Sequence, residues 1–565
     1  MTTVTFVTAF INVYNRNYDE RGIEYRFNKF YEIAETGIQI CVYASPEYFN
    51  KFKQAKKIYK NIKLMGGVDI KTTMVSKICS ANEYSLPNQR CEKKDTNEFL
   101  LFINSKWELL ANAIKNNPWN SSHFAWIDFS ISYIFKTLES SQEQLKMISN
   151  SRLKESFITI GGWSDKKISM DSFQDTFDTA IWRFCGGFML GDKESIREFV
   201  NLSSSYLPRF LDTYKKLTWE VNYWSWLETF TGWNPIWYYC MFDDSILRIP
   251  AYLYSLSLNR NPKYIHPYPT IGDNFTPSSS SHLLYKDKHI LNTRFVNYLL
   301  FENGEYLVFN ENRHIITKNM VSILDNNLII PISNDIMRDD NIDIDVIIDP
   351  NCSIFGFEDI RLYEYNEKIR FIATNRNYAP YQKNRMVIGD YNIETLSYEN
   401  CQVIDSPINA QYEKNWIPII HNNEELFIYS WSPFQVGRIN KNQLDIVYLY
   451  ENTNIAPNFY RVRGSSTFID YSGVLLGLVH FSDEGSPRNY YHMLVSLDKE
   501  TLHPLKYSDP FYFQHIGIEF CTGFYIKDNK YIFWVSKIDR NACMMTIPMV
   551  EIPLRFSFFI QKQIC

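Results

Sequence analysis

The segment FEDIRLYEYNEKIRFIATN, residues 357–375, opens with two adjacent acids and an arginine in a stretch that otherwise alternates like a half-buried strand. Because side chains on a strand point to opposite faces in turn, we expect Asp359 and Arg361 on one face and Glu358, turned into the sheet, on the other. A carboxylate beside a guanidinium is either a structural ion pair or the polar floor of a sugar or phosphate site. This segment alone leaves both interpretations open.

More polar residues stand at the edges of apolar strands in the C-terminal half. They are Lys414, Asn415, Arg463, His480, Tyr491, His492 and Glu519. Taken singly, Lys414 is a solvated lysine, Arg463 belongs to a structural ion pair and His480 is a core histidine. Gathered by the fold, their basic side chains and Arg361 would form a cationic pocket around Asp359, which would then be placed for proton transfer. Such a pocket suits a phosphate or a sugar phosphate. Glu519 would serve as the base in a hydrolytic alternative.

A recurring unit predicts how these residues are positioned. A polar Asn/Gly turn leads into an aromatic or aliphatic strand at NGEYLVFN (303–310), NEKIRFIATN (366–375), NEELFIYSW (423–431), GVLLGLVHF (473–481) and NKYIFWVSK (529–537). A near-regular period long enough for a four-stranded sheet is typical of propeller blades. We therefore predict an all-β five-bladed β-propeller over residues 285–565, with an irregular β-sandwich as the alternative.

The motifs Glu-Asp-x-Arg, Glu-Lys-Asn-Trp, Arg-Gly, Gly-x-x-His and Tyr-Tyr-His resemble those of the five-bladed β-mannoside phosphorylase and β-1,2-mannosyltransferase superfamily. The resemblance covers residues 285–565, with Arg294, Asn297 and Tyr298 in its first strand. It implies an inverting transfer with Asp359 as the acid/base. It also implies an anion site formed by Arg361, Lys414, Arg463, Tyr491 and His492. The phosphorylases usually have Pro where this chain has Ile360. This difference argues against phosphorolysis more than it argues against the propeller fold.

The first half has the pattern of an open α/β domain. Buried strands are expected over residues 3–13, 37–45 and 123–132, with a helix at about 21–35. Asp128 ends the third strand, where a sugar-nucleotide transferase needs an acid to hold a divalent metal, although a helix cap is an equal alternative. Gly186 and Gly187 would let the backbone approach a ligand, and Glu220 could serve an acceptor sugar.

The stretches VTAFINVYNR, WIDFS, FCGGFMLGDKESI and TWEVNYWSWLE resemble proposed glycosyltransferases of the HtrL/YibB type over residues 1–250. The resemblance implies a GT-A-like fold that uses a nucleotide-diphosphate sugar, with Asp128 at a Mn²⁺ or Mg²⁺ ion. The two-acid DxD form is absent because residue 130 is Ser, so metal dependence stays open.

Length, charge and cysteine content limit the number of domains, the binding partners and the compartment that these hypotheses allow. The 565 residues exceed what one core can hold, and we predict domains at 1–258 and 285–565 joined by a linker at 259–284. The net charge of -5 argues against a nucleic-acid binder. No apolar run suits a membrane helix or a signal peptide, and the ten cysteines are scattered singly, so we expect reduced thiols and a cytoplasmic protein, in the host cytoplasm if the source is a virus.

The preferred hypothesis is a bifunctional glycosyltransferase of glycan assembly. The first domain would use a nucleotide-diphosphate sugar, and the propeller, which needs no cofactor, would carry out an inverting and by resemblance mannosyl transfer to a glycan acceptor. Two alternatives remain: a glycan-binding propeller without catalysis, and a propeller glycoside hydrolase. The oligomeric state is left open.

Overall fold

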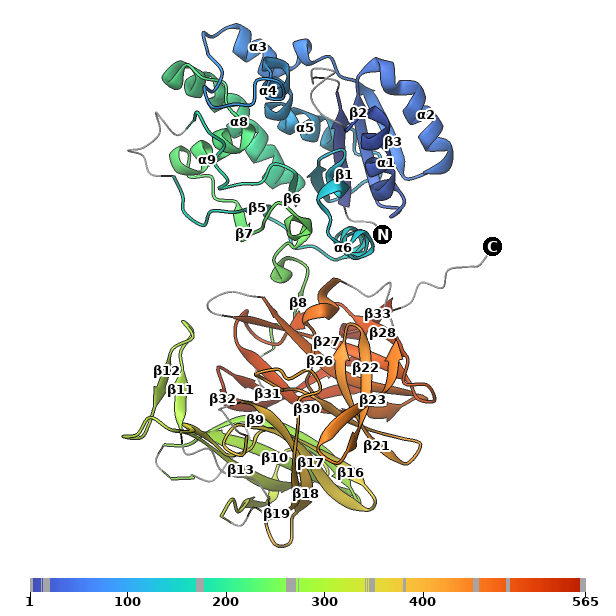
Figure 1. Cartoon of the computed structure of the whole chain (residues 1–565), viewed down its shortest axis with the longest axis vertical. Helices are drawn as coiled ribbons and strands as arrows, with labels where there is room; N and C mark the ends of the chain where they lie inside the picture. The colour runs from blue at the N-terminus through green and yellow to red at the C-terminus, as the bar shows by residue number, and fades with distance from the viewer. Residues whose placement is uncertain are drawn as a thin grey trace. The chain divides into compact units, whose positions relative to one another are not determined.

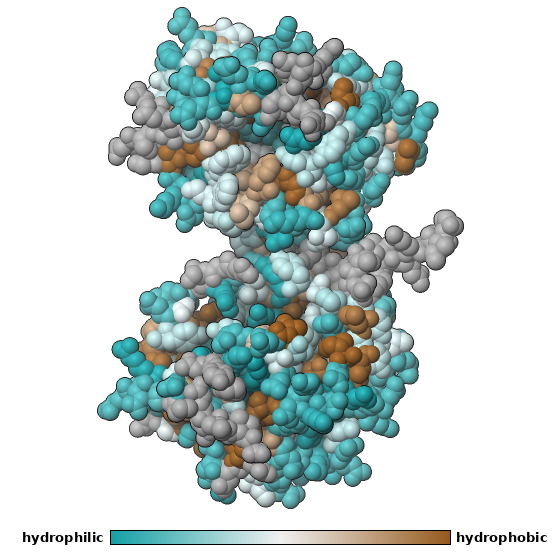
Figure 2. Space-filling model, viewed as in Figure 1, coloured by the Kyte–Doolittle hydropathy of each residue, from teal (hydrophilic) through white to brown (hydrophobic). Residues whose placement is uncertain are grey.

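The computed structural model describes residues 4–11, 13, 21–168, 177–260, 271–272, 274–340, 342, 344, 351–379, 383–450, 457–483 and 488–558. The chain divides into two compact units, an N-terminal unit, Met1–Tyr254, and a C-terminal unit, Ser255–Cys565 (Figure 1). In the described parts of the chain, no helix is long and apolar enough to cross a membrane. Hydrophilic residues cover most of the face drawn in Figure 2, with small hydrophobic patches between them.

The N-terminal unit is built on a seven-stranded sheet in the order β3-β2-β1-β4-β6-β5-β7. Its strands are β1 Val4–Phe10, β2 Gln39–Ala44, β3 Ile62–Gly67, β4 His123–Ile127, β5 Ile158–Gly162, β6 Phe188–Asp192 and β7 Ile236–Tyr239. The first four pair in parallel, as expected, but β6 runs antiparallel to both β4 and β5. The sheet is therefore mixed, and a GT-A fold remains a prediction.

Helices cover both faces of this sheet. They are α1 Ile23–Ala34, α2 Phe49–Ile58, α3 Met74–Ser80, α4 Asn97–Asn104, α5 Lys106–Asn116, α6 Leu138–Asn150, α8 Lys193–Tyr214 and α9 Glu220–Phe230. Val7 and Trp126 join a core with α4, α5, α8 and α9. On the other face, Phe10 packs on Phe27 of α1. Burial on both faces explains why β1 and β4 consist of buried residues throughout.

The C-terminal unit is a propeller-like arrangement of small sheets. Their orders are β14-β13-β10-β9, β16-β17-β18-β19, β20-β21-β22-β23, β24-β26-β27-β28-β33 and β30-β31-β32, with β15, β25, β29 and β8 added at the sides. Successive sheets touch where β9 meets β16, β16 meets β20, β21 meets β24, and β26 and β27 meet β30; β30 in turn meets β9, so the sheets close into a ring. In Figure 1 the strands of this unit run in colour from green at β9 to red at β33.

The strand bounds follow chain order. They are β8 Leu256–Ser257, β9 Thr276–Tyr285, β10 Lys288–Val296, β11 Tyr298–Leu300, β12 Tyr306–Val308, β13 Ile315–Leu324, β14 Pro331–Ile336, β15 Ile354–Phe355, β16 Glu358–Tyr365, β17 Lys368–Asn375, β18 Arg385–Asn392, β19 Ser397–Ile404, β20 Ile417–His421, β21 Glu424–Trp431, β22 Phe434–Asn440, β23 Gln443–Tyr450, β24 Arg463–Gly464, β25 Ile469–Tyr471, β26 Val474–Asp483, β27 Asn489–Asp498, β28 Pro504–Ser508, β29 Phe511–Tyr512, β30 Glu519–Lys527, β31 Lys530–Lys537, β32 Arg540–Pro548 and β33 Leu554–Ser557.

The recurring unit accounts for four sheets rather than five. Its copies at 366–375, 423–431, 473–481 and 529–537 form a turn followed by β17, β21, β26 and β31. In each turn two consecutive residues have positive φ, as in Asn422 and Asn423, which is the two-residue hairpin geometry that favours Asn and Gly. The copy at 303–310 instead contributes β12 to a separate two-stranded hairpin with β11. Five regular blades are therefore not confirmed.

The domain boundary also differs from the expected linker. Residues 276–284, assigned to the linker from their Ser-rich composition, lie in β9, which pairs along its length with β10. The run of serines in β9 is buried. Composition indicated a loop here, but burial between neighbouring sheets makes this segment a strand, because its backbone groups must be paired.

Candidate functional sites

The two acids that open β16 lie in a β-bulge. Glu358 pairs with Thr374 and Arg361 with Ile372, so one extra residue sits on the β16 side, and Asp359 has a φ of 53°. A bulge interrupts the alternation of side chains. Glu358 is consequently not turned away from Asp359, contrary to the expectation from strand periodicity, and the two carboxylates share a cation.

That cation is Arg294, from β10 of the neighbouring sheet. Its Nη1 donates to Asp359 Oδ1 at 3.2 Å, and its Nη2 lies 3.8 Å from Glu358 Oε1. Ser279 of β9 also donates to Asp359 Oδ1, at 3.3 Å. The Arg294 side chain is 7% exposed and both acids are 12% exposed. The two carboxylates therefore form a nearly buried charge cluster held from two sheets.

Lys414 completes the cluster on its open side. Its Nζ lies 3.3 Å from Glu358 Oε2, and its side chain is 34% exposed. Burial alone would raise the pKa of Glu358, but Lys414 and Arg294 outweigh burial and lower it. Glu358 in turn raises the pKa of Lys414. Of the predicted anion-binding residues, Lys414 is the one whose charge lies in this cluster.

A third acid, Asp539, reaches the cluster from the turn between β31 and β32. Tyr298 donates to Asp539 Oδ2 at 2.8 Å. Burial raises the pKa of Asp539, and Arg294 opposes that rise. Burial alone would lower the pKa of Arg294, but Tyr298 and the three acids hold it well above its usual value. The site thus joins Glu358, Asp359 and Asp539 to the two cations.

Arg361 does not face a ligand. It is fully buried, and its guanidinium donates to the backbone carbonyls of Ser465, Gly464 and Asp359 and to Asn415 Oδ1 at 2.6–3.2 Å. Burial lowers the pKa of Arg361 to about 10. Four of its five N–H groups bind the protein itself, one of them to Asn415, so the geometry does not support the predicted anion-binding role of Arg361.

The remaining basic candidates do not form the expected pocket. His492 is buried, with a pKa lowered by burial to about 3, and its Nε2–H donates to Glu519 O at 3.2 Å. His480 is buried beside Ser465 Oγ at 2.8 Å, and burial holds its pKa well below the usual value. Both histidines are neutral near pH 7, so they cannot supply the predicted positive charge.

Arg463 and Tyr491 lie in different environments, one exposed and the other buried. Arg463 lies opposite His480 in the β24–β26 pairing and is exposed. Tyr491 is fully buried, with its ring 5.4 Å from that of Phe481. Adjacent strand residues face opposite sides, which separates Tyr491 from His492. Arg463 alone of the two remains open to an anion.

Glu519 anchors a loop. Its carboxylate accepts backbone N–H groups from Phe513, Gln514 and His515 at 2.7–3.0 Å. Burial raises its pKa, and the three N–H groups oppose that rise. Because both oxygens are engaged by the backbone, the arrangement does not support the predicted role as a water-activating base.

In the N-terminal unit, the predicted residues do come together, around a lysine that was not predicted. Lys106, the first residue of α5, lies 3.1 Å from Asp128 Oδ1 and 2.8 Å from Glu220 Oε1. It also donates to Gly186 O at 2.8 Å. Burial lowers the pKa of Lys106, but the two carboxylates more than offset this, so the net shift is upward.

The glycines form the wall of this site. A Cβ on Gly186 would lie 2.2 Å from Glu220 Oε1, and one on Gly187 would lie 3.6 Å from Asp128 Oδ2. Asp128 N–H donates to Gly187 O at 2.9 Å. Since β4 and β6 are antiparallel, the end of β4 meets the start of β6, which places Asp128 beside the two glycines.

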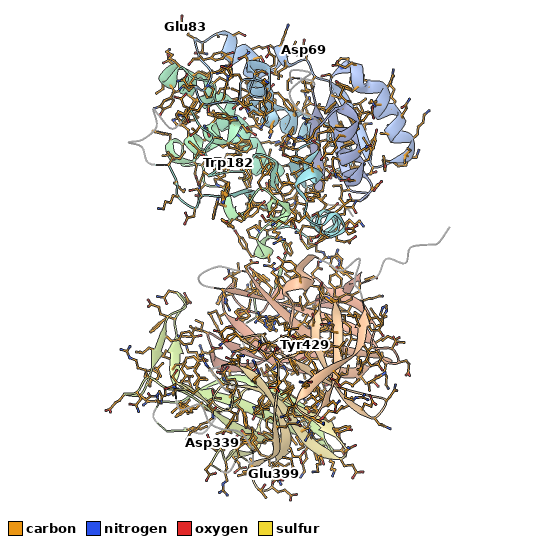
Figure 3. The ribbon with its side chains drawn as sticks, viewed as in Figure 1. Asp69, Glu83, Trp182, Asp339, Glu399 and Tyr429 are labelled. Carbon is orange, nitrogen blue, oxygen red and sulfur yellow. The ribbon has the colours of Figure 1, made fainter. Side chains whose placement is uncertain are left out.

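Exposed aromatic side chains follow the same edge of the sheet. Trp163 comes directly after β5, Tyr239 ends the parallel strand β7, and Trp182, labelled in Figure 3, accepts the Trp163 N–H through its backbone oxygen. All three side chains are exposed. Aromatic faces at the carboxyl edge of an α/β sheet are suited to stacking on sugar rings.

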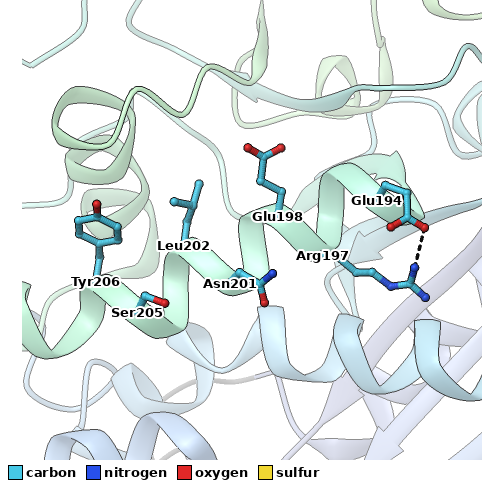
Figure 4. A pocket seen from close by; sticks show the side chains of 7 residues that line it. All are labelled: Glu194, Arg197, Glu198, Asn201, Leu202, Ser205 and Tyr206. Carbon is cyan, nitrogen blue, oxygen red and sulfur yellow. Dashed lines mark hydrogen bonds and ion pairs between the residues drawn. The ribbon is translucent and has the colours of Figure 1, made fainter.

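A separate surface hollow lies along α8 and is lined by Glu194, Arg197, Glu198, Asn201, Leu202, Ser205 and Tyr206 (Figure 4). All seven residues come from one helix, and Arg197 pairs with Glu194 at 2.6 Å. Among the described residues, no second element lines this hollow. We therefore place the candidate sites at Asp359 and at Asp128.

Comparisons with known proteins match parts of this chain. Residues 2–207 match the model of a family described as bacterial protein of unknown function (HtrL_YibB). No curated protein matches the chain. Among solved structures, β-1,2-mannobiose phosphorylase from Listeria innocua is similar at 12% identity, covering 50% of this chain and 93% of that one, with a TM-score of 0.32.

Two proteins from Leishmania mexicana are also similar. The GDP-Man-dependent mannosyltransferase MPT-1 has 10% identity, 49% and 86% coverage of the two chains, and a TM-score of 0.32. The mannose phosphorylase MPT-4, in complex with phosphate ion, has 12% identity, 49% and 85% coverage, and a TM-score of 0.31. TM-scores this low show no shared activity, so the functional conclusion depends on the site residues.

Sequence reasoning missed three site residues. Lys106 starts a helix in SKWELL, and its charge among apolar neighbours was the available signal. Asp539 stands in the turn KIDRN, directly after a strand that was predicted. Arg294 was placed in a strand without a site role, although an arginine between Thr293 and Phe295 in a buried strand requires a charged partner.

Proposed function

We propose that the C-terminal unit acts on a glycosidic bond, with Asp359 as the acid/base in an inverting transfer. The observation that supports this most strongly is the placement of Asp359 in a bulge, where Arg294 and Ser279 fix Oδ1. A proton-transfer group needs a fixed carboxylate that is not sealed from substrate. Asp359 retains a 12% exposed side chain beside the more open Lys414.

The charges constrain the second substrate. Arg294 acts on all three acids, and Lys414 and Arg376 also act on Glu358, so three cations balance three acids and none is in surplus for a free phosphate. A glycan or water suits such a site better than inorganic phosphate, in line with Ile360 replacing the proline of the phosphorylases. Transfer of a mannosyl group remains the preferred reaction because the strand motifs resemble those of mannosyl-transferring propellers.

Hydrolysis is the alternative that one observation favours. An inverting hydrolase needs a second carboxylate to activate water. Glu519 is engaged by its own loop, but Asp539 shares the cluster with Asp359, and burial raises its pKa. Without an acceptor glycan, the same site would transfer the sugar to water.

For the N-terminal unit, we propose transfer from a nucleotide-diphosphate sugar to a glycan. The supporting observation is the convergence of Asp128, Glu220 and the two glycines at the carboxyl edge of β4. Ligands of open α/β sheets bind at this edge. The whole chain would then be a bifunctional glycosyltransferase, in which fusion raises the local concentration of the shared glycan.

One experiment tests both proposals. The purified chain is incubated with GDP-mannose, UDP-sugars, mannose 1-phosphate and β-linked mannosides, with and without a glycan acceptor. Nucleotide release should be lost in Asp128→Ala, and mannoside turnover should be lost in Asp359→Asn, each variant keeping the other activity. A propeller that only binds glycans would keep its glycan affinity in Asp359→Asn and show no mannoside turnover in the wild type.

A further inference from the structure

The N-terminal site contains a fixed cation of its own. All three N–H donors of the Lys106 ammonium are used, by Asp128 Oδ1, Glu220 Oε1 and Gly186 O at 2.8–3.1 Å. The side chain is 4% exposed, and its Nζ lies 5.4 Å from the centre of the Trp126 ring. These contacts hold the positive charge in one place.

A divalent metal does not fit the same residues. In the described part of the chain, no three His, Cys, Asp or Glu side chains gather as metal ligands. Asp128 Oδ1 already accepts from Lys106 and from Trp126 Nε1 at 2.8 Å. A metal between Asp128 and Glu220 would have to share its place with the ammonium, and like charges at that distance repel strongly.

Among the described residues, the contacts of Asp128 with Lys106 and Trp126 are made by Oδ1 and leave Oδ2 for a ligand. The Asp128 side chain is 47% exposed, and Oδ2 lies beside Gly187, where a Cβ would be 3.6 Å away. With the lysine and two acids, the cluster carries one net negative charge. An exposed carboxylate oxygen in such a site is suited to accept hydrogen bonds from hydroxyl groups.

We infer that Lys106 takes the place of a divalent metal in the N-terminal site, and that Asp128 binds sugar hydroxyl groups directly rather than through a metal. The inference deepens the transferase function proposed for this unit. It replaces the expectation of Mn²⁺ or Mg²⁺ at Asp128.

Binding of Mn²⁺ itself provides the test, because it needs no substrate. Electron paramagnetic resonance measures free Mn²⁺ during titration of the full chain as wild type, Asp128→Asn, Lys106→Met and the double variant. Lys115→Met, on an exposed position of the same helix, is the matched control. Circular dichroism checks that each variant is folded.

The wild type and Asp128→Asn should bind Mn²⁺ equally weakly. Lys106→Met should bind Mn²⁺ at least about tenfold more tightly, and the double variant should lose that gain, because removal of the ammonium frees two carboxylates. Lys115→Met should match the wild type. Tighter Mn²⁺ binding by the wild type than by Asp128→Asn would overturn the inference, and this comparison decides the question even if Lys106→Met does not fold.

Nucleotide-sugar binding, measured by calorimetry with and without EDTA, separates this inference from the transferase function. Binding that survives EDTA and is lost in Asp128→Ala supports both. If no nucleotide sugar binds under either condition, the transferase function fails, whereas the Mn²⁺ result on Lys106 still stands. Binding that needs added Mn²⁺ overturns the role given to Lys106 while leaving the transferase function intact.

Discussion

Arg294 Nη1 lies 3.2 Å from Asp359 Oδ1, although 65 residues separate them along the chain and they belong to different sheets. The same guanidinium approaches Glu358 at 3.8 Å. Because of this contact between two sheets, Glu358 and Asp359 form part of a nearly buried charge cluster and are not the solvated end of a strand.

Replacement of Arg294 by Met should both destabilise the C-terminal unit and abolish its turnover. Removing one partner from a buried ion pair leaves the other charge uncompensated, at a cost of roughly 3–5 kcal/mol. Urea unfolding measures the loss. Arg438→Met, on an exposed pair with Glu424, should cost only about 0–1 kcal/mol. Unchanged stability in Arg294→Met would show that the cluster is not buried as described.

Replacement of Arg361 by Lys separates a structural arginine from an anion-binding one. Lysine cannot reproduce a planar fork that reaches Ser465 O, Gly464 O and Asn415. We expect a loss of roughly 1–3 kcal/mol in unfolding free energy. The folded fraction should keep the wild-type KM for phosphate-bearing substrates. A raised KM with full stability would restore the anion-binding role.

Glu519→Gln should weaken the loop at residues 513–515 rather than the chemistry. The carboxylate has two oxygens that accept from three backbone N–H groups, whereas the amide has only one acceptor oxygen. We therefore expect the free energy of unfolding to fall by about 1–3 kcal/mol. Hydrogen exchange at Gln514 and His515 should increase, while kcat stays within about twofold in the absence of any proton-transfer role. A variant with normal stability and no turnover would identify Glu519 as the base after all.

His492 should make stability depend on pH in the acid range. Its folded pKa, about 3, is below the ordinary histidine value of 6.5, so the unfolded chain binds a proton first as the pH falls. Its contribution is therefore complete above pH 6.5 and is lost between 6.5 and about 3, at no more than about 1.4 kcal/mol per pH unit. His492→Gln should flatten this part of the stability curve. An unchanged slope would mean that His492 protonates normally in the folded protein.

The sequence predicted the N-terminal site better than the C-terminal one. Asp128, Gly186 and Gly187 meet because the end of β4 lies beside the start of β6, a relationship that follows from sheet topology, and Glu220 reaches them from the start of α9. Lys106 was missed because its one signal, a charge among apolar neighbours in SKWELL, does not say which carboxylates it meets in the fold. In the C-terminal unit, the bulge breaks the alternation of side chains on which the prediction rested. Glu358, expected to point into the sheet, lies in the charge cluster, and Arg361, expected in the site, is buried.

The fold shows the same limit. Turns with two positive-φ residues leave a clear sequence signature, so β17, β21, β26 and β31 were located correctly. The buried serines of β9 resemble a linker in composition, and only their packing against other sheets makes them a strand. Contacts from distant segments, such as Asp539 to Tyr298, cannot be read from local patterns.

Turnover of β-linked mannosides by Asp359→Asn, beside Glu364→Gln on the exposed side of the same strand, tests the central claim most directly. The account predicts that Asp359→Asn folds, binds the glycan and loses at least about 100-fold in kcat, while Glu364→Gln behaves as the wild type. Turnover by Asp359→Asn equal to that of the wild type would contradict it.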